Sequence, residues 1–340
     1  MRERASPLPG PPGGGKKPAP GAAWHDCGLK AGTISPQSAT IPMPSSHPLP
    51  PRRSALIGPP PPPPPVLATV APAPTPVPEG PASAHYAVSG AWVCHVGKVR
   101  RANEDACLAG TILSADSLDT PAAVRVARGP WIVAVSDGLG GHRGGAEASH
   151  TVVSALAGCK RVTPHSITDL LHRLNRHLCE RGAKDSELAA MGATIAGLGC
   201  GGRGLFAFHI GDSRIYRWEN DALVQLTRDD SEAEDLIDLG LLERTADKRP
   251  GFLHALTQAI GGRTVAEEIQ IHIQPLRVAQ CTRFIICSDG LTDMLAAAEI
   301  ETLVRGERAA AGVVAALFSA AMEAGGRDNI TIAVVDVEPA

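Results

Sequence analysis

The sequence predicts an antiparallel α+β fold, preceded by a segment that does not fold. Predicted strands come in groups, and predicted helices do not alternate one for one with them, which argues against a doubly wound sheet. Of the 30 prolines in the 340-residue chain, 24 lie in residues 1–81, and so much proline prevents helix and sheet. We therefore predict a disordered Pro-rich segment at 1–84 and one globular domain at 85–340.

Six segments have the residue pattern of strands. The continuous apolar runs 131–136 (WIVAVS) and 283–288 (RFIICS) are typical of central strands that are covered on both faces. The others are apolar or β-branched segments at 193–198, 205–210, 215–218 and 330–337. The glycine-rich stretch 199–204 predicts a hairpin loop, and Asn220-Asp221 predicts a turn.

Three helices are predicted after or between these strands. Thr163-Pro164 marks a helix start, and one face of that helix would carry Leu170, Leu171, Leu174 and Leu178. A capping-box pattern at 231–234 precedes Leu236, Leu239 and Leu242. The apolar stretch 309–322 has 14 residues, which is too short to span a bilayer and suits a buried helix.

The two parts of the chain differ in charge. Residues 1–84 hold seven Lys and Arg against three Asp and Glu, a net charge of +4. Subtracting these from the totals of 32 and 35 leaves 25 basic and 32 acidic residues, a net charge of −7, for residues 85–340. This acidic balance argues against nucleic acid as a partner and is compatible with cation binding.

The cysteines indicate a reducing compartment. There are eight, none in a C-x-x-C pair, and the N-terminus lacks the apolar stretch of a secretory signal. We expect a cytoplasmic protein with free thiols and no membrane span.

Acidic residues cluster at five expected strand ends. The clusters are at 103–105, 136–138, 211–213, 288–290 and 327–329, and Ser-Asp-Gly-Leu occurs in two of them. A single Asp-Gly is more often a turn than a metal site, but five such clusters favour a shared site. Converging carboxylates have raised pKa values unless a cation lies between them. Oxygen ligands suit Mg²⁺ or Mn²⁺, and two such ions can activate one water for attack on phosphorus.

These clusters belong to a longer series of motifs. The stretch GKVRRANED at 97–105 is similar to an opening G-x-x-R-x-x-N-E-D motif, and DGLGGH at 137–142 is similar to D-G-x-G-G-H. Further matching stretches follow in order at 145–149, 191–194, 211–216, 226–229, 259–261, 288–293 and 328–331. Together they resemble the metal-dependent serine/threonine protein phosphatases of type 2C (PPM), bacterial type, over residues 90–338.

The resemblance implies a fold and a set of site residues. The fold would be a four-layer α-β-β-α sandwich of two packed antiparallel sheets with helices outside each. Asp137 would bridge two Mn²⁺ or Mg²⁺ ions, with the Gly138 carbonyl as a further ligand. The other implied ligands are Glu104, Asp289 and Asp328, and Asp212 would help to hold a third, weaker ion. Asp105 would lie nearby.

The resemblance also implies a mechanism. A metal-bridging hydroxide would attack phosphorus directly, with Arg100 binding the substrate phosphate through its planar guanidinium. Arg100, Asp137 and Asp289 would then be the catalytic residues, and the cysteines would take no part.

Three positions depart from the eukaryotic pattern or leave a role open. Leu139 stands where many eukaryotic members carry a histidine, whereas bacterial members usually carry an apolar residue. His142 has no assigned role. Asp230 stands where the family often has histidine, in the flap expected at 228–250, which leaves substrate preference and the third ion open.

Two other functions remain as alternatives. One is a catalytically weak phosphoprotein-binding regulatory module on the same fold, and the other is a phosphohydrolase of small molecules. As a phosphatase, the chain would act as a monomer on phosphorylated proteins and oppose a serine/threonine kinase. The Pro-rich segment is either a tether, a ligand for aromatic-lined grooves, or a product of start-site choice, since Met43 is an internal candidate.

Overall fold

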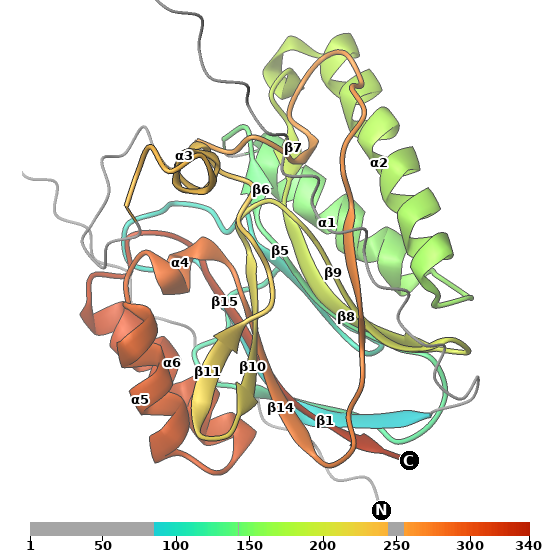
Figure 1. Cartoon of the computed structure of the whole chain (residues 1–340). Helices are drawn as coiled ribbons and strands as arrows, with labels where there is room; N and C mark the ends of the chain where they lie inside the picture. The colour runs from blue at the N-terminus through green and yellow to red at the C-terminus, as the bar shows by residue number, and fades with distance from the viewer. Residues whose placement is uncertain (1–84, 142, 244–254) are drawn as a thin grey trace, which may run out of the picture. The chain divides into compact units, whose positions relative to one another are not determined.

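The computed structural model describes residues 85–141, 143–243 and 255–340 (Figure 1). The Pro-rich segment at 1–84, His142 and residues 244–250 of the expected flap lie outside the described residues. The boundary predicted near residue 85 therefore stays a prediction.

Two six-stranded antiparallel sheets form the centre of the described part. Sheet I has the order β11 (Ala222–Gln225), β10 (Arg214–Glu219), β14 (Thr282–Cys287), β15 (Ile330–Pro339), β1 (Tyr86–His95) and β4 (Ala122–Val126). Sheet II has the order β13 (His272–Leu276), β9 (Gly204–Ile210), β8 (Ile195–Gly201), β5 (Trp131–Ser136), β2 (Ala106–Ala109) and β3 (Ile112–Ser114). A small third sheet joins β12 (Ile260–Gly261), β7 (Gly192–Ala193) and β6 (Gly138–Leu139).

Helices cover the outer face of each large sheet (Figure 1). The helices α1 (Arg143–Ala157) and α2 (Pro164–Lys184) share a buried apolar cluster with sheet II. The helices α4 (Asp289–Thr292), α5 (Ala297–Gly306) and α6 (Ala310–Glu323) share another with sheet I. The remaining elements are a 3₁₀ helix at Ser186–Leu188 and α3 (Glu232–Asp238). The predicted four-layer sandwich is confirmed.

The continuous apolar runs follow from this layering. In β5, Val133 and Val135 pack between the sheets, whereas Ile132 and Ala134 pack toward the helices. In β14, Phe284 and Ile286 face the central core, and Ile285 faces α4–α6. Each strand is buried on both faces, so apolar residues occupy every position rather than alternate ones.

The predicted helix starts and the 220–221 turn are largely confirmed. Thr163 caps α2 in a capping box with Ser166, and α6 matches the apolar stretch at 309–322. The Ser231 hydroxyl accepts the Glu234 N–H at 3.4 Å at the start of α3. Asn220 and Asp221 have φ values of 51° and 57° between β10 and β11.

The predicted hairpin between the strands at 193–198 and 205–210 is confirmed, but its loop is shorter than the predicted 199–204. β8 continues to Gly201 and pairs with β9, which begins at Gly204. Gly199 is needed because a Cβ there would lie 2.6 Å from the Phe206 ring. The prediction that the helix after Ser231 carries Leu236, Leu239 and Leu242 on one apolar face is wrong. The helix α3 stops at Asp238, and Leu239 is 71% exposed.

Candidate active site

The two Ser-Asp-Gly-Leu motifs end strands in different sheets, and their carboxylates interact. Asp137 follows β5 of sheet II, and Asp289 follows β14 of sheet I. Burial raises the pKa of Asp137 well above its usual value, and Asp105, Asp289 and Asp212 raise it further. Burial, then Asp293 and Asp328, raise the pKa of Asp289 to about 6. Carboxylates distant in the sequence therefore form one crowded site, as the motifs predict.

The glycines of both motifs allow backbone segments to approach closely. A Cβ on Gly138 would lie 2.2 Å from the carbonyl oxygen of Gly145, in the first turn of α1. A Cβ on Gly290 would lie 1.8 Å from the carbonyl oxygen of Asn329, which adjoins Asp328. Glycine thus follows each aspartate because no side chain fits where the strand end meets its neighbour.

Asp105 is the most enclosed carboxylate of the group. It is 0% exposed and directly precedes β2 of sheet II. Its Oδ2 accepts hydrogen bonds from Ser288 Oγ at 2.8 Å and Thr331 Oγ1 at 2.6 Å, both from the sheet I side. Burial raises the pKa of Asp105 to about 7, and these two hydroxyls oppose the rise. Neutral donors from one sheet therefore hold a carboxylate of the other.

Thr194 fixes the backbone of Asp137. The Asp137 N–H donates to Thr194 Oγ1 at 3.1 Å, and the Thr194 N–H donates to the Asp137 carbonyl oxygen at 2.9 Å. Thr194 Oγ1 also lies 2.8 Å from Ser213 Oγ. Ser213 adjoins Asp212, so this threonine joins the segments that carry two of the predicted ligands.

Asn329 ties Asp328 to the loop that carries Glu104. Its Oδ1 accepts the Glu104 N–H at 2.8 Å, and its Nδ2 donates to the carbonyl oxygens of Val96 and Ala102, each at 3.0 Å. The Glu104 carbonyl oxygen accepts from Ser149 Oγ of α1 at 2.5 Å. Glu104 is thereby anchored from both sides of the sandwich.

Arg100 lies at the edge of the carboxylate group. Its Nη2 donates to Asp328 Oδ2 at 2.6 Å, and its side chain is 53% exposed. The hydrogen bond with Asp328 raises the pKa of Arg100, and the nearby Glu104 and Asp137 add to this effect. The guanidinium therefore faces both the acidic site and solvent.

Asp212 lies where the chain crosses from sheet II to sheet I. Burial, then Asp289 and Asp229, raise its pKa well above the usual value, and Arg214 opposes the rise. Arg214 is held by Asp229, with Nη2 to Oδ2 at 2.6 Å and Nε to Oδ1 at 2.9 Å. Asp212 thus belongs electrostatically to the group around Asp289.

Asp230, which stands where the family often has histidine, holds neighbouring segments together. Its Oδ2 accepts the Gly211 N–H at 2.9 Å, and its Oδ1 lies 3.0 Å from His272 Nε2. Asp230 therefore holds the start of the crossing segment that carries Asp212.

Comparison with known proteins identifies the family. The protein phosphatase 2C family model matches residues 107–330. The chain belongs to the protein phosphatase 2C family. The predicted resemblance, and the serine/threonine phosphatase class that goes with it, are therefore confirmed at the level of the family.

Similar members of the family are bacterial serine/threonine phosphatases. The phosphatase stp of Listeria innocua is 28% identical over 214 residues, which make up 60% of this chain and 84% of stp. PstP of Mycobacterium tuberculosis is 29% identical over 248 residues, which make up 71% of this chain but only 43% of PstP.

Solved phosphatase structures share the fold. The crystal structure of PstP/Ppp from Mycobacterium tuberculosis has a TM-score of 0.61 at 28% identity, and the match covers 74% of this chain and 99% of that one. A structure of the PstP catalytic domain in complex with two manganese ions has a TM-score of 0.59 at 27% identity, covering 74% and 99%.

The site of this type 2C phosphatase has acidic residues that suit a divalent cation, although they are not arranged as a complete set of ligands. The described residues contain no group of three or more His, Cys, Asp or Glu side chains already arranged as a metal site. However, the buried Oδ1 atoms of Asp105 and Asp289 have no hydrogen-bond partner among those residues. Unpaired buried acceptors are costly, and a hard cation would satisfy them, so the residues fit Mg²⁺ or Mn²⁺.

Several residues that hold the carboxylates in place are not predicted from the sequence. Thr194 and Thr331 lie within matched motifs, and Ser288 begins the second Ser-Asp-Gly-Leu, but hydroxyl groups carry no distinctive pattern of their own. Asp105 receives only a minor role from the motifs, although it is buried more completely than Asp137 or Asp289.

Proposed function

We propose that this phosphatase hydrolyses phosphoserine and phosphothreonine in proteins with the help of bound Mn²⁺ or Mg²⁺. The observation that supports it is the crowding of Asp105, Asp137, Asp212 and Asp289 from both sheets into one site, with raised pKa values and two unpaired buried oxygens. Such a group is unfavourable in the absence of a cation. The family's dependence on metal ions supports the same proposal.

The proposed ligands come from both sheets. Asp137, the Gly138 carbonyl and Glu104 would hold ions from the sheet II side, and Asp289 and Asp328 from the sheet I side. Asp212 would help to hold a third ion. When bound, such ions lower the pKa of a coordinated water and offset charge on the phosphoryl group.

Arg100 would bind the phosphate of the substrate. In the structure one guanidinium nitrogen is engaged with Asp328, and the other N–H groups have no partner among the described residues. They belong to the planar fork of a permanent cation that lies beside Asp328 and is 53% exposed, and such a fork could bind two oxygens of a phosphate. Arg100 would therefore place the phosphorus for attack.

Direct hydrolysis is favoured over a cysteinyl-phosphate intermediate. The thiols near the site, Cys94 and Cys287, are both 0% exposed. Burial raises the pKa of each to about 12, so neither forms the thiolate that a nucleophile requires.

The test is hydrolysis of a phosphothreonine peptide with and without Mn²⁺, by the wild-type protein and by Asp137→Asn and Asp289→Asn variants. We expect manganese-dependent turnover that falls at least about a hundredfold in both variants, since each removes a charged ligand. Asp336→Asn, which is remote from the site in β15, should retain activity. A folded wild-type protein that binds Mn²⁺ but turns over no peptide would instead favour the phosphoprotein-binding module.

The proposed substrate implies a partner enzyme. A protein phosphomonoester must be made by a kinase, so we propose that the enzyme opposes a serine/threonine kinase and acts on the targets of that kinase. We also propose that it acts as a monomer and does not bind nucleic acid. No helix in the described ranges has the length and apolar character to cross a membrane. The seven described cysteines are all free, which supports a reducing, cytoplasmic setting. A panel of phosphorylated small molecules would test the remaining alternative.

A further inference from the structure

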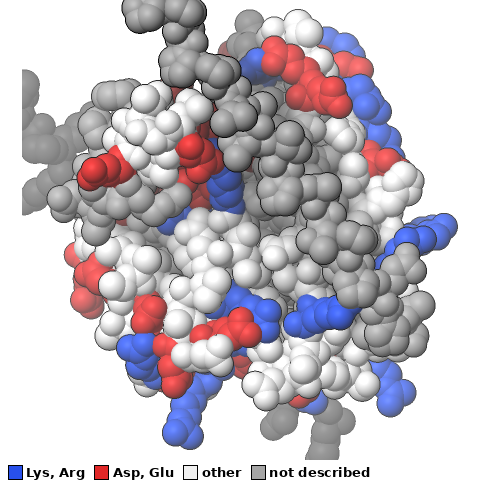
Figure 2. Space-filling model, viewed as in Figure 1, with Lys and Arg blue, Asp and Glu red and all other residues white. Residues whose placement is uncertain are grey.

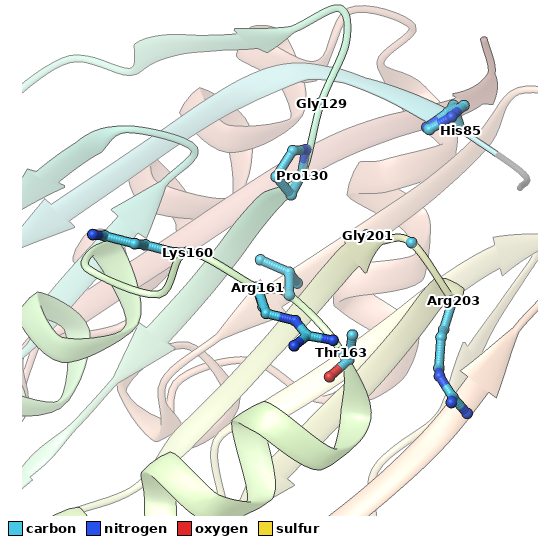
Figure 3. A pocket seen from close by; sticks show the side chains of 10 residues that line it. His85, Gly129, Pro130, Lys160, Arg161, Thr163, Gly201 and Arg203 are labelled. Carbon is cyan, nitrogen blue, oxygen red and sulfur yellow. The ribbon is translucent and has the colours of Figure 1, made fainter.

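A basic pocket lies away from the carboxylate site, where the loop before α2 meets the β8–β9 hairpin (Figure 3). Its volume is about 420 Å³, within the range of small-ligand sites. Its charged lining residues are Lys160, Arg161 and Arg203, with His85 at one side, and no Asp or Glu lines it. This is unexpected in a globular part whose overall charge is negative.

The cations of this pocket are not neutralised within the fold. Among the described residues, the side chains of Lys160, Arg161 and Arg203 form no ion pair and donate no hydrogen bond. In contrast, many other arginines are paired, such as Arg214 with Asp229 and Arg283 with Asp336. On the face seen in Figure 2, basic and acidic side chains are also interspersed. Uncompensated cations that share one concavity raise its affinity for anions.

The backbone around the pocket is fixed before any ligand binds. The Arg161 carbonyl oxygen accepts from Ser166 Oγ at 2.5 Å, and the capping box of Thr163 holds the next turn. A Cβ on Gly201 would lie 2.0 Å from the Val162 carbonyl oxygen, so the hairpin end touches this loop directly. Figure 3 shows Arg161 and Arg203 extending from these two segments on either side of Thr163, whereas Lys160 points away.

The chemistry of the lining selects the ligand. Two guanidinium groups can each donate two parallel hydrogen bonds to a tetrahedral dianion. The lining has no Phe, Tyr or Trp on which a base could stack, which disfavours nucleotides and RNA. We propose that Arg161 and Arg203 form a second, non-catalytic binding site for a phosphate group, either as free phosphate or carried on a phosphorylated protein segment.

The site is separate from the reaction centre. The strand β8 leads from Ile195, beside Thr194, to Gly201 in the pocket. Seven residues of extended strand span roughly 20 Å at about 3.3 Å per residue. A ligand in the pocket therefore does not touch Asp137.

The test is a titration of the full-length protein in Mg²⁺ with inorganic phosphate and with a peptide that carries a non-hydrolysable phosphonate analogue of phosphothreonine. Backbone amide chemical shifts of Gly201, Gly202 and Arg203 report on the pocket, and those of the residues around Asp137 report on the reaction centre. The variants are Arg161→Ala/Arg203→Ala and a control, Arg176→Ala, which removes an exposed charge on α2 outside the pocket.

We expect saturable shifts at Gly201–Arg203 in the wild-type protein and in Arg176→Ala. The double variant should bind at least tenfold more weakly at the pocket, about 1.4 kcal/mol, while it hydrolyses phosphothreonine peptide at the wild-type rate. Tighter binding of the peptide than of phosphate would identify a phosphoprotein segment as the source, and equal binding would identify free phosphate. Shifts confined to the reaction centre, or unchanged pocket binding in the double variant, would overturn the proposal.

Discussion

Removing a proposed metal ligand should stabilise the protein when no metal is bound. Asp289 lies among carboxylates that raise its pKa to about 6, and its Oδ1 is buried without a hydrogen-bond partner among the described residues. Asp289→Asn removes the charge and keeps the shape. In metal-free buffer at neutral pH, the free energy of unfolding should therefore rise, although the same change should abolish activity.

The pKa shift gives the size and the pH window of this effect. A rise from 3.8 to about 6 corresponds to about 3 kcal/mol of destabilisation once the group is ionised. Asp289 is only partly buried, so solvent screening reduces this to about 1–2 kcal/mol. Because the folded state binds the proton more tightly than the unfolded chain, stability is lost as pH rises from about 4 to about 6. The gain in the variant should be full at about pH 7.5 and small near pH 4.

Thermal unfolding in excess chelator, and again with Mn²⁺, measures the prediction. At about 2–4 °C per kcal/mol for a domain of this size, the variant should unfold about 2–8 °C above the wild-type protein in chelator. Mn²⁺ should raise the midpoint of the wild-type protein more than that of the variant. Asp336→Asn is the matched control, because it breaks the pairing with Arg283 at 2.7 and 2.8 Å and should lower the midpoint. If Asp289→Asn is less stable than the wild-type protein in chelator, the crowding argument is refuted.

Three further outcomes are expected. Arg100→Ala should lower kcat/KM for a phosphothreonine peptide about 10–100-fold, the value of a charged hydrogen bond, and Arg100→Lys should recover only part; equal activity of all three proteins would contradict the phosphate-binding role. Gly290→Ala should yield little folded protein, since the new Cβ would lie 1.8 Å from the Asn329 carbonyl oxygen, whereas Gly306→Ala meets nothing within 4 Å and should fold normally by circular dichroism. Deletion of residues 1–84 should leave activity intact, and a soluble but inactive truncation would count against that view.

The sequence predicts that the carboxylates converge because the ends of buried strands can be recognised from its apolar runs. A run such as WIVAVS must be buried on both faces, so the aspartate that follows it emerges at the edge of a sheet. When a second run ends in the same four residues, the simplest account is a shared site, and the raised pKa values of Asp137 and Asp289 agree with it. The sequence predicts Gly138 and Gly290 only as turn residues. It does not predict their close backbone contacts, because the backbone atoms that they approach belong to other segments of the chain.

The supporting hydrogen bonds are beyond what the sequence can predict. Serine and threonine occur throughout the chain, and nothing local marks Ser288 and Thr331 as donors to Asp105. Their role depends on how two strands from sheet I meet the start of β2 in sheet II, which is a tertiary property. The same holds for the pairing of Arg100 with Asp328, whose residues are 228 positions apart.

These neutral contacts explain how the sandwich tolerates its own acidic site. Carboxylates from opposite sheets repel one another, and that repulsion acts to separate the layers at this edge. The Ser288 and Thr331 hydroxyls bind a carboxylate across the gap, and Asn329 binds the Glu104 backbone across it as well. Because these side chains are uncharged, they hold the sheets together without neutralising the site, and the negative charge remains available for cations.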